Sequence, residues 1–532
     1  MVIPASVHCK LPPAAQLLVQ GGDARIALDA EGKNKYGCPP VPDATLLALG
    51  SSTASCISGA GFAAADRLRN RLVQLAESEP DAVIYARELE RMRREFIRLC
   101  GVSDMHGLEV VFSASGTDLH LIAAQLVSAE EPGPLLAIMV DAAETGSGVP
   151  AALSGHRCRR GAARGEASAV EVMQEEGAGE DSDSGNAIEV VTVAIRQADG
   201  MPRPPAEVDA EFEAWVNRAA PAGKRVLLVL TDVSKTGMIA PSPACARALQ
   251  KKFPHVVEVL VDACQFRIAP STLRSYLARD FMVALTGSKF VTGPPFSGAL
   301  LIPEQAAQHL RKQPLPRALS AFSARADWPQ NWPAAGLLDD VANFGLLLRW
   351  EAALEELRAL RALPEAVVTN FLQEFARAIS RRLADDPVFE PLPVSALERF
   401  PLHGAKNWDA TQTIFPFLLM YPQADGSKLP LSCEQTAQIY RLLQIDLSDR
   451  AEMDMSPVLA ALRCQLGQPV ACGSRAGVPV NALRLCASAR MVVEASAEGG
   501  RNVSAIIERA LAALDKTALL ILSVCNPNSK QK

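Results

Sequence analysis

The sequence predicts an α/β fold in which a mostly parallel sheet is flanked by helices. Two almost continuous apolar runs, residues 256–261 and 281–285, are typical of strands buried on both faces. Similar runs at 108–112, 188–195 and 225–230 are each followed by helical or loop material. Parallel neighbours in a sheet need such crossover connections, so the alternation favours one large sheet with helices on its faces.

A lysine follows the run 281–285. Lys289 comes after Thr286 and Ser288 and just before a Gly-Pro-Pro turn at 293–295. Desolvation at the end of a buried strand lowers the pKa of a lysine and frees its amine as a nucleophile. Lys289 is therefore predicted to bind an aldehyde cofactor as a Schiff base; the alternative is a solvated or ion-paired lysine.

An acidic residue ends the run 256–261. Asp262 falls at the carboxyl end of a predicted parallel strand, where open α/β sheets bind ligands. Pyridoxal phosphate needs an anion beside its pyridinium nitrogen, and Asp262 fits that role. Gln265 is placed to hydrogen-bond the phenolic oxygen of the ring. The alternative for Asp262 is a helix N-cap.

Small residues follow the run 108–112, at a predicted turn from strand to helix. Such a turn leaves backbone N–H groups free at the helix N-terminus, which is a phosphate cradle. Ordinary turn hydroxyls are the alternative for Thr117 and Ser288. The residues assigned to the phosphate are Ser115, Gly116, Thr117, Thr286 and Ser288.

In this order, these elements resemble the fold-type I pyridoxal-phosphate enzymes, and within them the class V aminotransferase and cysteine desulfurase superfamily. The resemblance runs from about residue 34 to about residue 495. It implies a large cofactor-binding domain, a smaller α+β domain, a small amino-acid substrate and a homodimer. It also places the loop 231–236 near the cofactor oxygen.

Two departures from the family concern the cofactor ring. Thr145 stands where the family usually has a ring-stacking histidine, and threonine offers no aromatic face. Asp232 stands where many relatives have asparagine, so a second carboxylate is expected near the cofactor. Both changes indicate altered chemistry.

The carboxyl-terminal part resembles the Cys-Ala-Gln-Pro and Arg-x-Ser stretches of SUF-type desulfurases and selenocysteine lyases. The match implies that Arg484 binds the substrate α-carboxylate, a task suited to a planar bidentate cation. The alternative for Arg484 is a surface salt bridge. The match puts Leu466 where the desulfurases have their nucleophilic cysteine. Cys464 and Cys472 are the nearest thiols; for Cys464 an inert buried thiol is the favoured interpretation. Asn34, in a turn-rich stretch expected over the active-site mouth, is a second candidate substrate contact.

Composition narrows the class of protein. The chain has 532 residues and a formal charge of −6, with no basic footprint for nucleic acid. Its 12 cysteines include no CxxC pair, and its seven histidines form no ligand motif, so no metal is predicted. No apolar run reaches membrane-spanning length and no secretory signal is recognised, which favours a cytoplasmic protein.

Three segments are expected. Residues 1–60 join the small domain and cover the active site, 61–335 form the large cofactor-binding domain, and 336–532 form the carboxyl-terminal small domain. Within the large domain, 156–186 change from basic to acidic and are rich in Gly, Ala and Ser, which is typical of a mobile insertion.

Three functions compete. Transamination comes first because it needs only a lysine that shuttles protons and no additional nucleophile. A Cβ–S or Cβ–Se lyase, or a desulfurase-like enzyme, is the alternative suggested by the carboxyl-terminal resemblance. A non-catalytic scaffold that binds pyridoxal phosphate is the third, and the intact lysine, aspartate and phosphate set argues against it.

Overall fold

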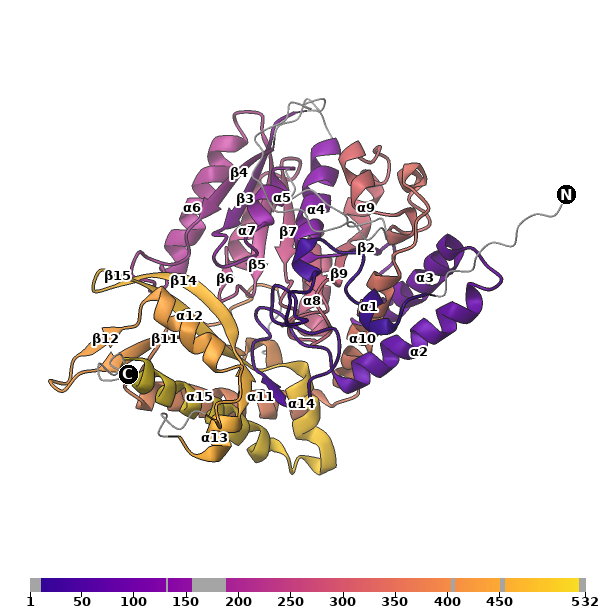
Figure 1. Ribbon diagram of the computed structural model, residues 1–532. Helices are drawn as coiled ribbons and strands as arrows, with labels where there is room; N and C mark the ends of the chain where they lie inside the picture. Colours follow the sequence, from indigo (N-terminus) through magenta and orange to yellow (C-terminus); the bar gives the residue numbers. More distant parts are fainter. Residues whose placement is uncertain (1–10, 131–132, 156–187, 403–406, 450–454, 526–532) are drawn as a thin grey trace.

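The computed structural model describes residues 11–130, 133–155, 188–402, 407–449 and 455–525. An eight-stranded sheet dominates the molecule, and a five-stranded sheet, drawn in orange in Figure 1, lies beside it. The expected α/β fold with an additional, smaller α+β unit is confirmed. The domain boundaries at 60 and 335 stay predictions, and the expected insertion 156–186 lies outside the described residues.

The larger sheet has the strand order β2-β9-β8-β7-β5-β3-β4, with β6 paired to β5. The neighbours β8, β7, β5, β3 and β4 run parallel, while β9 is antiparallel to both β2 and β8. All five apolar runs predicted as strands lie in this sheet. The strands are β2 (Glu109–Ser113), β3 (Leu135–Val140), β4 (Ile188–Val193), β5 (Arg225–Asp232), β6 (Ile239–Ala240), β7 (Val257–Asp262), β8 (Met282–Thr286) and β9 (Gly298–Ile302).

Helices cover both faces of this sheet because alternate strand residues point to opposite sides. In β2, for example, Val111 belongs to one apolar cluster, and Val110 and Phe112 belong to the other. The first cluster packs against α4 (Gly116–Glu130), α5 (Val149–Leu153) and α9 (Glu304–Leu310). The second packs against α2 (Gly59–Leu75), α3 (Asp81–Leu99), α6 (Pro205–Ala219), α7 (Pro243–Lys252), α8 (Pro270–Leu277) and α10 (Phe344–Arg361).

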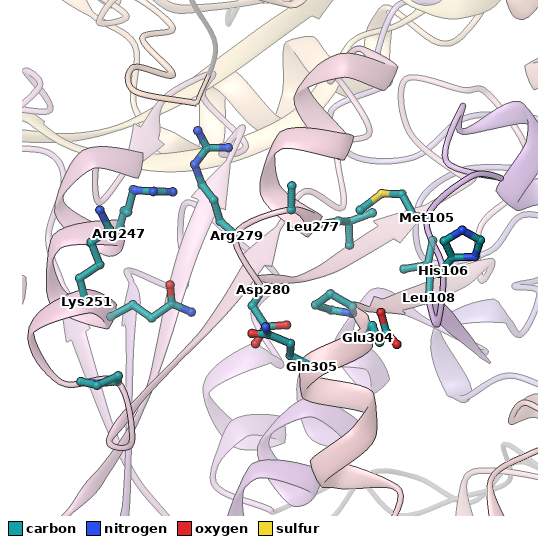
Figure 2. Close-up of a pocket in the computed structure, with 14 residues that line it drawn as sticks. Met105, His106, Leu108, Arg247, Lys251, Leu277, Arg279, Asp280, Glu304 and Gln305 are labelled. Carbon is teal, nitrogen blue, oxygen red and sulfur yellow. The ribbon is translucent and has the colours of Figure 1, made fainter.

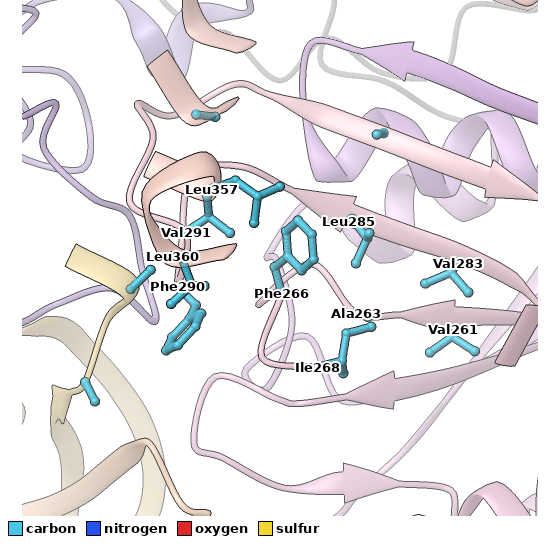
Figure 3. Packing of buried hydrophobic residues seen from close by; sticks show 14 of the residues in the cluster. Val261, Ala263, Phe266, Ile268, Val283, Leu285, Phe290, Val291, Leu357 and Leu360 are labelled. Atoms are coloured by element: carbon cyan, nitrogen blue, oxygen red, sulfur yellow. The ribbon is translucent and has the colours of Figure 1, made fainter. Parts of the chain in front are cut away.

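The second cluster continues past the ends of the strands. Figure 3 shows Val283 and Leu285 of β8 beside Phe266, with Leu357 and Leu360 of α10 closing the far side. Phe290 packs at the edge of this group, 5.3 Å from the stacked ring of Trp408. The segment that follows β8 is therefore held by core packing.

The smaller sheet is antiparallel, with the order β10-β11-β15-β14 and β12 paired to β11. The amino-terminal segment joins this half of the molecule, because β1 (Leu46–Ala48) pairs with β13 (Arg463–Gln465). The remaining elements are α1 (Ala14–Leu17), β10 (Phe389–Pro391), β11 (Ile414–Pro422), β12 (Lys428–Pro430), β14 (Gly467–Arg475), β15 (Val478–Cys486), α11 (Glu365–Asp385), α12 (Cys433–Leu442), α13 (Pro457–Ala461), α14 (Ala489–Ser496) and α15 (Val503–Cys525). None of the helices in the described ranges is both long and apolar enough to cross a membrane.

The packing of β8 leads to a prediction for stability. Leu285 is fully buried, so Leu285→Ala removes apolar contacts and leaves a cavity; we expect it to lower the free energy of unfolding by about 2–5 kcal/mol. Leu429→Ala is the matched control, since Leu429 is 53% exposed on β12, and we expect a change within about 0.5 kcal/mol. Chemical denaturation of both variants measures the difference. Equal shifts of the two midpoints would contradict the assignment of Leu285 to the core.

Candidate functional site

A cavity of about 230 Å³ lies at the carboxyl ends of β7 and β8. Asp262 ends β7, Thr286 ends β8, and Ser288 and Lys289 follow directly. The amino end of α4, residues of the amino-terminal segment and residues of β14 and β15 complete the wall. The predicted site residues that line this cavity are Ser115, Gly116, Thr117, Asp262, Thr286, Ser288, Lys289 and Arg484.

Lys289 is held among carbonyl groups. Its Nζ lies 3.3 Å from the carbonyl oxygens of both Ser52 and Thr53. Burial lowers the pKa of Lys289 from its ordinary value because desolvation disfavours the ammonium form. The hydroxyl of Ser55 donates to the Lys289 carbonyl at 3.0 Å, which fixes the backbone. The residue thus combines a fixed position with an amine that is easier to deprotonate than that of an exposed lysine.

Asp262 forms a buried pair with His120 of α4. The His120 Nε2 atom lies 3.3 Å from Asp262 Oδ2, and the N–H of Cys264 donates to Asp262 Oδ1 at 3.1 Å. Burial by itself raises the pKa of a carboxyl group, but the charge and hydrogen bond of His120 outweigh it and hold the pKa of Asp262 at about 2. The carboxylate is therefore ionised throughout the physiological range.

His120 is a site residue that the sequence analysis missed. Its Nδ1 atom lies 2.8 Å from the Gly116 carbonyl, one helical turn earlier, which orients the ring toward Asp262. Although burial favours neutral imidazole, the charge of Asp262 raises the pKa of His120. A histidine four residues after the phosphate turn, inside an apolar helix, was the available sequence signal.

The amino end of α4 approaches the sheet closely at Gly116. A Cβ atom at this position would lie 3.0 Å from Cys264 Sγ and 3.1 Å from Thr286 Cγ2, so glycine permits a closer approach than a residue with a side chain. The first N–H groups of a helix have no partner within the helix and favour an anion. The hydroxyl of Thr117 lies beside them and also lines the cavity.

Arg25 reaches the same end of the cavity from the amino-terminal segment. Its Nη1 donates to Thr117 Oγ1 at 3.2 Å, and its Nη2 donates to Ser115 Oγ at 3.4 Å. An ion pair with Asp23 at 2.6 Å and the ring of Phe296, 5.2 Å away, hold the guanidinium group. This second missed residue adds a cation to the anion site formed by α4. Arg25 is 92 positions from Thr117 and 90 from Ser115 in the sequence, so no local motif indicated that it belongs to this site.

Arg484, on β15, also lines the cavity and is only 1% exposed. Its Nε donates to Ser52 Oγ at 3.0 Å and its Nη2 to Thr53 Oγ1 at 2.7 Å. In the described part of the chain, Nη1 has no hydrogen-bond partner. A buried guanidinium nitrogen without an acceptor is costly, which makes this group a receptor for a carboxylate.

Gly467 makes room for this arginine. It is the cross-strand partner of Arg484 in β14, and a Cβ atom there would lie 2.9 Å from Arg484 Nε and from Ser52 Oγ. The glycine of the sequence motif is therefore needed for a close approach. The alternative interpretation of Arg484 as a surface salt-bridge partner is wrong, because the side chain is buried and no acidic group in the described ranges pairs with it.

Two predicted residues support the cavity wall without lining it. Gln265 donates through Nε2 to the Ser52 carbonyl at 2.9 Å, the same carbonyl that faces Lys289. Asn34 accepts the N–H groups of Tyr36 at 2.9 Å and Cys38 at 3.1 Å, and so stabilises a turn. Asn34 is outside the described cavity lining, and its predicted contact with substrate stays a prediction. Tyr36 and its neighbour Lys35 line the cavity instead.

Asp232 and Thr145, the two residues that depart from the family pattern, both lie outside the described cavity lining. Asp232 is fully buried; both of its oxygens accept from Arg399 at 2.7 Å, and Tyr276 donates to it at 2.6 Å. The expected second carboxylate near the cofactor is therefore absent from the described cavity lining, because Asp232 forms a separate ion pair. Thr145 is 6% exposed, outside the cavity lining, and its hydroxyl has no hydrogen-bond partner among the described residues.

The carboxyl-terminal thiols do not reach the cavity. Cys464 is fully buried in the main apolar cluster, and burial raises the pKa of its thiol to about 12. Burial also raises the pKa of Cys472, which packs in a small cluster of the second sheet. The thiol that lines the cavity is Cys264, whose pKa is raised by burial and by the neighbouring Asp262. A protonated thiol is a poor nucleophile.

A larger cavity, of about 530 Å³, lies elsewhere (Figure 2). It is lined by Arg247 and Lys251 of α7, by Asp280 just before β8 and by Glu304 just after β9. These positions mark the amino ends of the parallel strands, the edge opposite Lys289. Open α/β sheets bind their ligands at the carboxyl ends, so the smaller cavity is the candidate site. In the ranges that the structure describes, no group of three or more potential ligands is arranged to hold a metal ion.

The sequence matches no model of a protein family and no curated protein. Its structure is similar to the cystine C–S lyase C-DES in complex with its reaction product cysteine persulfide, with 14% identity and a TM-score of 0.53 over 88% of this chain and 98% of that chain. A lysine-to-alanine mutant of C-DES with glycine covalently linked to the PLP cofactor gives 14% identity and a TM-score of 0.50 over 88% and 99%. The cysteine desulfurase CsdA from Escherichia coli gives 16% identity and a TM-score of 0.45 over 88% and 94%.

The likeness to C-DES extends over 88% of this chain and 98% of that chain. It is a likeness of fold at low sequence identity. The chain has the fold of the fold-type I pyridoxal-phosphate-dependent enzymes.

Proposed function

We propose that this protein is a pyridoxal-phosphate-dependent enzyme that acts on a small amino acid, and that its reaction is a transamination. The observation that carries the proposal is the convergence of Lys289, Asp262 and the amino end of α4 on one cavity. When bound, pyridoxal phosphate withdraws electrons from the α-carbon of an amino acid, which makes the α-proton removable.

The described residues fit this cofactor at each of its polar ends. The α4 N-terminus, with Thr117 and Arg25, offers N–H groups, a hydroxyl and a cation to a phosphate. The ionised Asp262 offers an anion to a protonated ring nitrogen, and His120 keeps that anion charged. Each group is fixed by a contact of its own, so the site is organised by the protein itself.

Lys289 is the residue that would carry the proton. Its lowered pKa makes the amine available both for covalent attachment to an aldehyde and for accepting the α-proton. Hydrogen bonds to two backbone carbonyls position the amine without neutralising it. Such an acid/base group needs a pKa near the working pH, and burial moves Lys289 in that direction.

Arg484 would orient the substrate. Its unpartnered Nη1 is directed to an acceptor that the described residues do not supply, and a substrate α-carboxylate is such an acceptor. Ser52 and Thr53 hold the other two nitrogens, so the guanidinium plane is fixed before the substrate binds. Preorganisation of this kind reduces the cost of binding.

Cleavage of a Cβ–S or Cβ–Se bond is the second candidate. Gln468 and Pro469, which match the desulfurase motif, line the cavity. A mechanism that needs a protein persulfide is disfavoured, because Cys464 and Cys472 are buried away from the cavity. The decisive experiment adds single amino acids to the holoenzyme and follows both the cofactor absorbance and the products. Pyridoxamine phosphate supports transamination. Sulfide released with pyruvate and ammonia supports the lyase, and alanine with sulfur passed to an added thiol supports the desulfurase-like reaction.

The role of Lys289 is tested with Lys289→Ala. We expect turnover to fall by at least about 100-fold because the proton carrier is lost, while the phosphate and ring-nitrogen contacts retain part of the cofactor. Borohydride reduction followed by mass spectrometry should attach the cofactor to Lys289 in the parent protein and to no residue in the variant. Undiminished turnover in the variant would overturn the assignment.

The reaction type is tested at Cys464. If the enzyme transaminates, Cys464→Ala and Cys464→Ser keep the rate within about an order of magnitude, a barrier change of about 1.4 kcal/mol or less. A persulfide mechanism would lose nearly all activity, because neither side chain replaces a thiolate nucleophile. Loss of turnover in folded variants, with sulfur adducts on Cys464 in the parent, would make the lyase the better proposal.

Homodimerisation is a further expectation from the fold-type I resemblance, since active sites in that group are commonly completed by a neighbouring subunit. Sedimentation should give about twice the chain mass of 56.7 kDa. A monomer with full activity would refute this expectation.

A further inference from the structure

The cavity carries more positive than negative charge. Its described lining contains Arg25, Lys35, Lys235, Lys289 and Arg484, whereas its only carboxylate among these residues is Asp262. Asp262 is paired with His120, and Arg25 with Asp23. A phosphate and an α-carboxylate would account for Arg25 and Arg484. Lys235 then has no anion assigned to it. It is half-buried, whereas Lys35 is exposed.

The backbone of Lys235 is held firmly. Lys235 is in the turn after β5, and its N–H donates to the carbonyl of Glu144 at 2.8 Å. On either side, the hydroxyls of Ser234 and Thr236 each donate to the Glu144 carboxylate at 2.7 Å. This turn therefore has a fixed shape, and the lysine side chain is directed to the cavity from a rigid base.

Glu144 is not the ionic partner of Lys235. Its carboxylate is already bound by Ser234, by Thr236 and by the Nε of Arg196 at 2.9 Å. In the described part of the chain, no hydrogen bond or ion pair involves the ammonium group of Lys235. Burial, and next the charges of Lys289 and Arg484, lower the pKa of Lys235 to about 8, against the weaker influence of Glu144. Lys235 lines the same cavity as both residues that are proposed to meet the substrate.

We propose that Lys235 binds an acidic group on the substrate side chain, so that the preferred amino acid carries a second anionic group beside its α-carboxylate. The inference rests on the proposed function and specifies its substrate class. Arg484 takes the α-carboxylate, Lys289 faces the α-carbon, and Lys235 supplies the remaining cation at the same cavity. An incoming carboxylate or sulfinate supplies the anion that Lys235 lacks.

The test compares acidic amino acids with their neutral isosteres. The parent holoenzyme, Lys235→Met and Lys235→Arg are titrated with L-aspartate, L-glutamate, L-cysteine sulfinate, L-asparagine and L-glutamine. Cofactor absorbance gives the dissociation constants, and turnover gives kcat/KM. Lys428→Met is the matched control, because Lys428 is exposed on β12, outside the cavity.

We expect the parent enzyme to prefer the acidic member of each pair by about 10-fold to 100-fold, as charge-assisted hydrogen bonds allow. Lys235→Met should abolish this preference, because it lowers kcat/KM for the acidic amino acids more than for their neutral isosteres. Lys235→Arg should keep most of the preference, and Lys428→Met all of it. Comparing the dissociation constant of L-cysteine sulfinate with those of L-aspartate and L-glutamate identifies which anionic group binds most tightly.

A pH series adds an independent readout. Since the free Lys235 has a pKa of about 8, the preference for the acidic amino acid should decrease as the pH rises through 8. Lys289, Arg484 and Glu144 face the same group, so the series is repeated with Lys235→Arg, in which the cation persists and the decrease should disappear.

Four results would overturn the inference. Equal loss for acidic and neutral amino acids in Lys235→Met would assign Lys235 to the α-carboxylate, and a changed absorbance of the resting variant would assign it to the cofactor. If the parent enzyme binds neutral amino acids as tightly as acidic ones, the proposed substrate class is refuted while the proposed function stands. Absence of any spectral response to any amino acid would instead refute the proposed function, and the inference with it.

Discussion

The close approach of α4 to the carboxyl edge of the sheet at Gly116 is the constraint on which the site depends. A Cβ atom at this position would crowd the side chains of Cys264 and Thr286, which follow β7 and end β8. Because the helix lies this close, its N–H groups reach the cavity and His120, one turn later, reaches Asp262. One packing contact thus determines both the anion site and the charge state of the buried carboxylate.

A short amino-terminal segment connects the other half of the site. The carbonyl of Ser52 faces both Lys289 and Gln265, and the hydroxyls of Ser52 and Thr53 accept from Arg484. The Thr53 hydroxyl also accepts the N–H of Gln468 at 3.1 Å. Residues more than 200 positions apart are therefore fixed relative to each other by two residues. In this arrangement the segment is part of the site.

Electrostatics explains why the site suits anions. Burial lowers the pKa values of Lys289, Lys235 and Arg484, and each of them lacks an acidic partner in the described structure. A bound anion would relieve this arrangement, so substrate binding and charge compensation favour each other. The buried ion pair of Asp232 with Arg399 is different, because it is complete within the protein and supports the fold.

The sequence by itself determined the sheet and its functional edge. Apolar runs mark strands directly, and a residue at the end of a run, such as Asp262 or Lys289, is carried by its strand to the carboxyl edge. Gly116 and Thr286 were placed at that edge for the same reason, whereas Arg484 was assigned from the resemblance to the desulfurases. Arg25, His120 and Lys235 were not singled out, and Asp232 and Asn34 have hydrogen-bond partners that the sequence did not indicate. These outcomes depend on contacts between segments far apart in the chain, such as Arg399 with Asp232 and Arg25 with Thr117. Only the tertiary structure decides which of several possible partners a polar side chain meets, because strand and helix patterns specify local geometry and not long-range pairing.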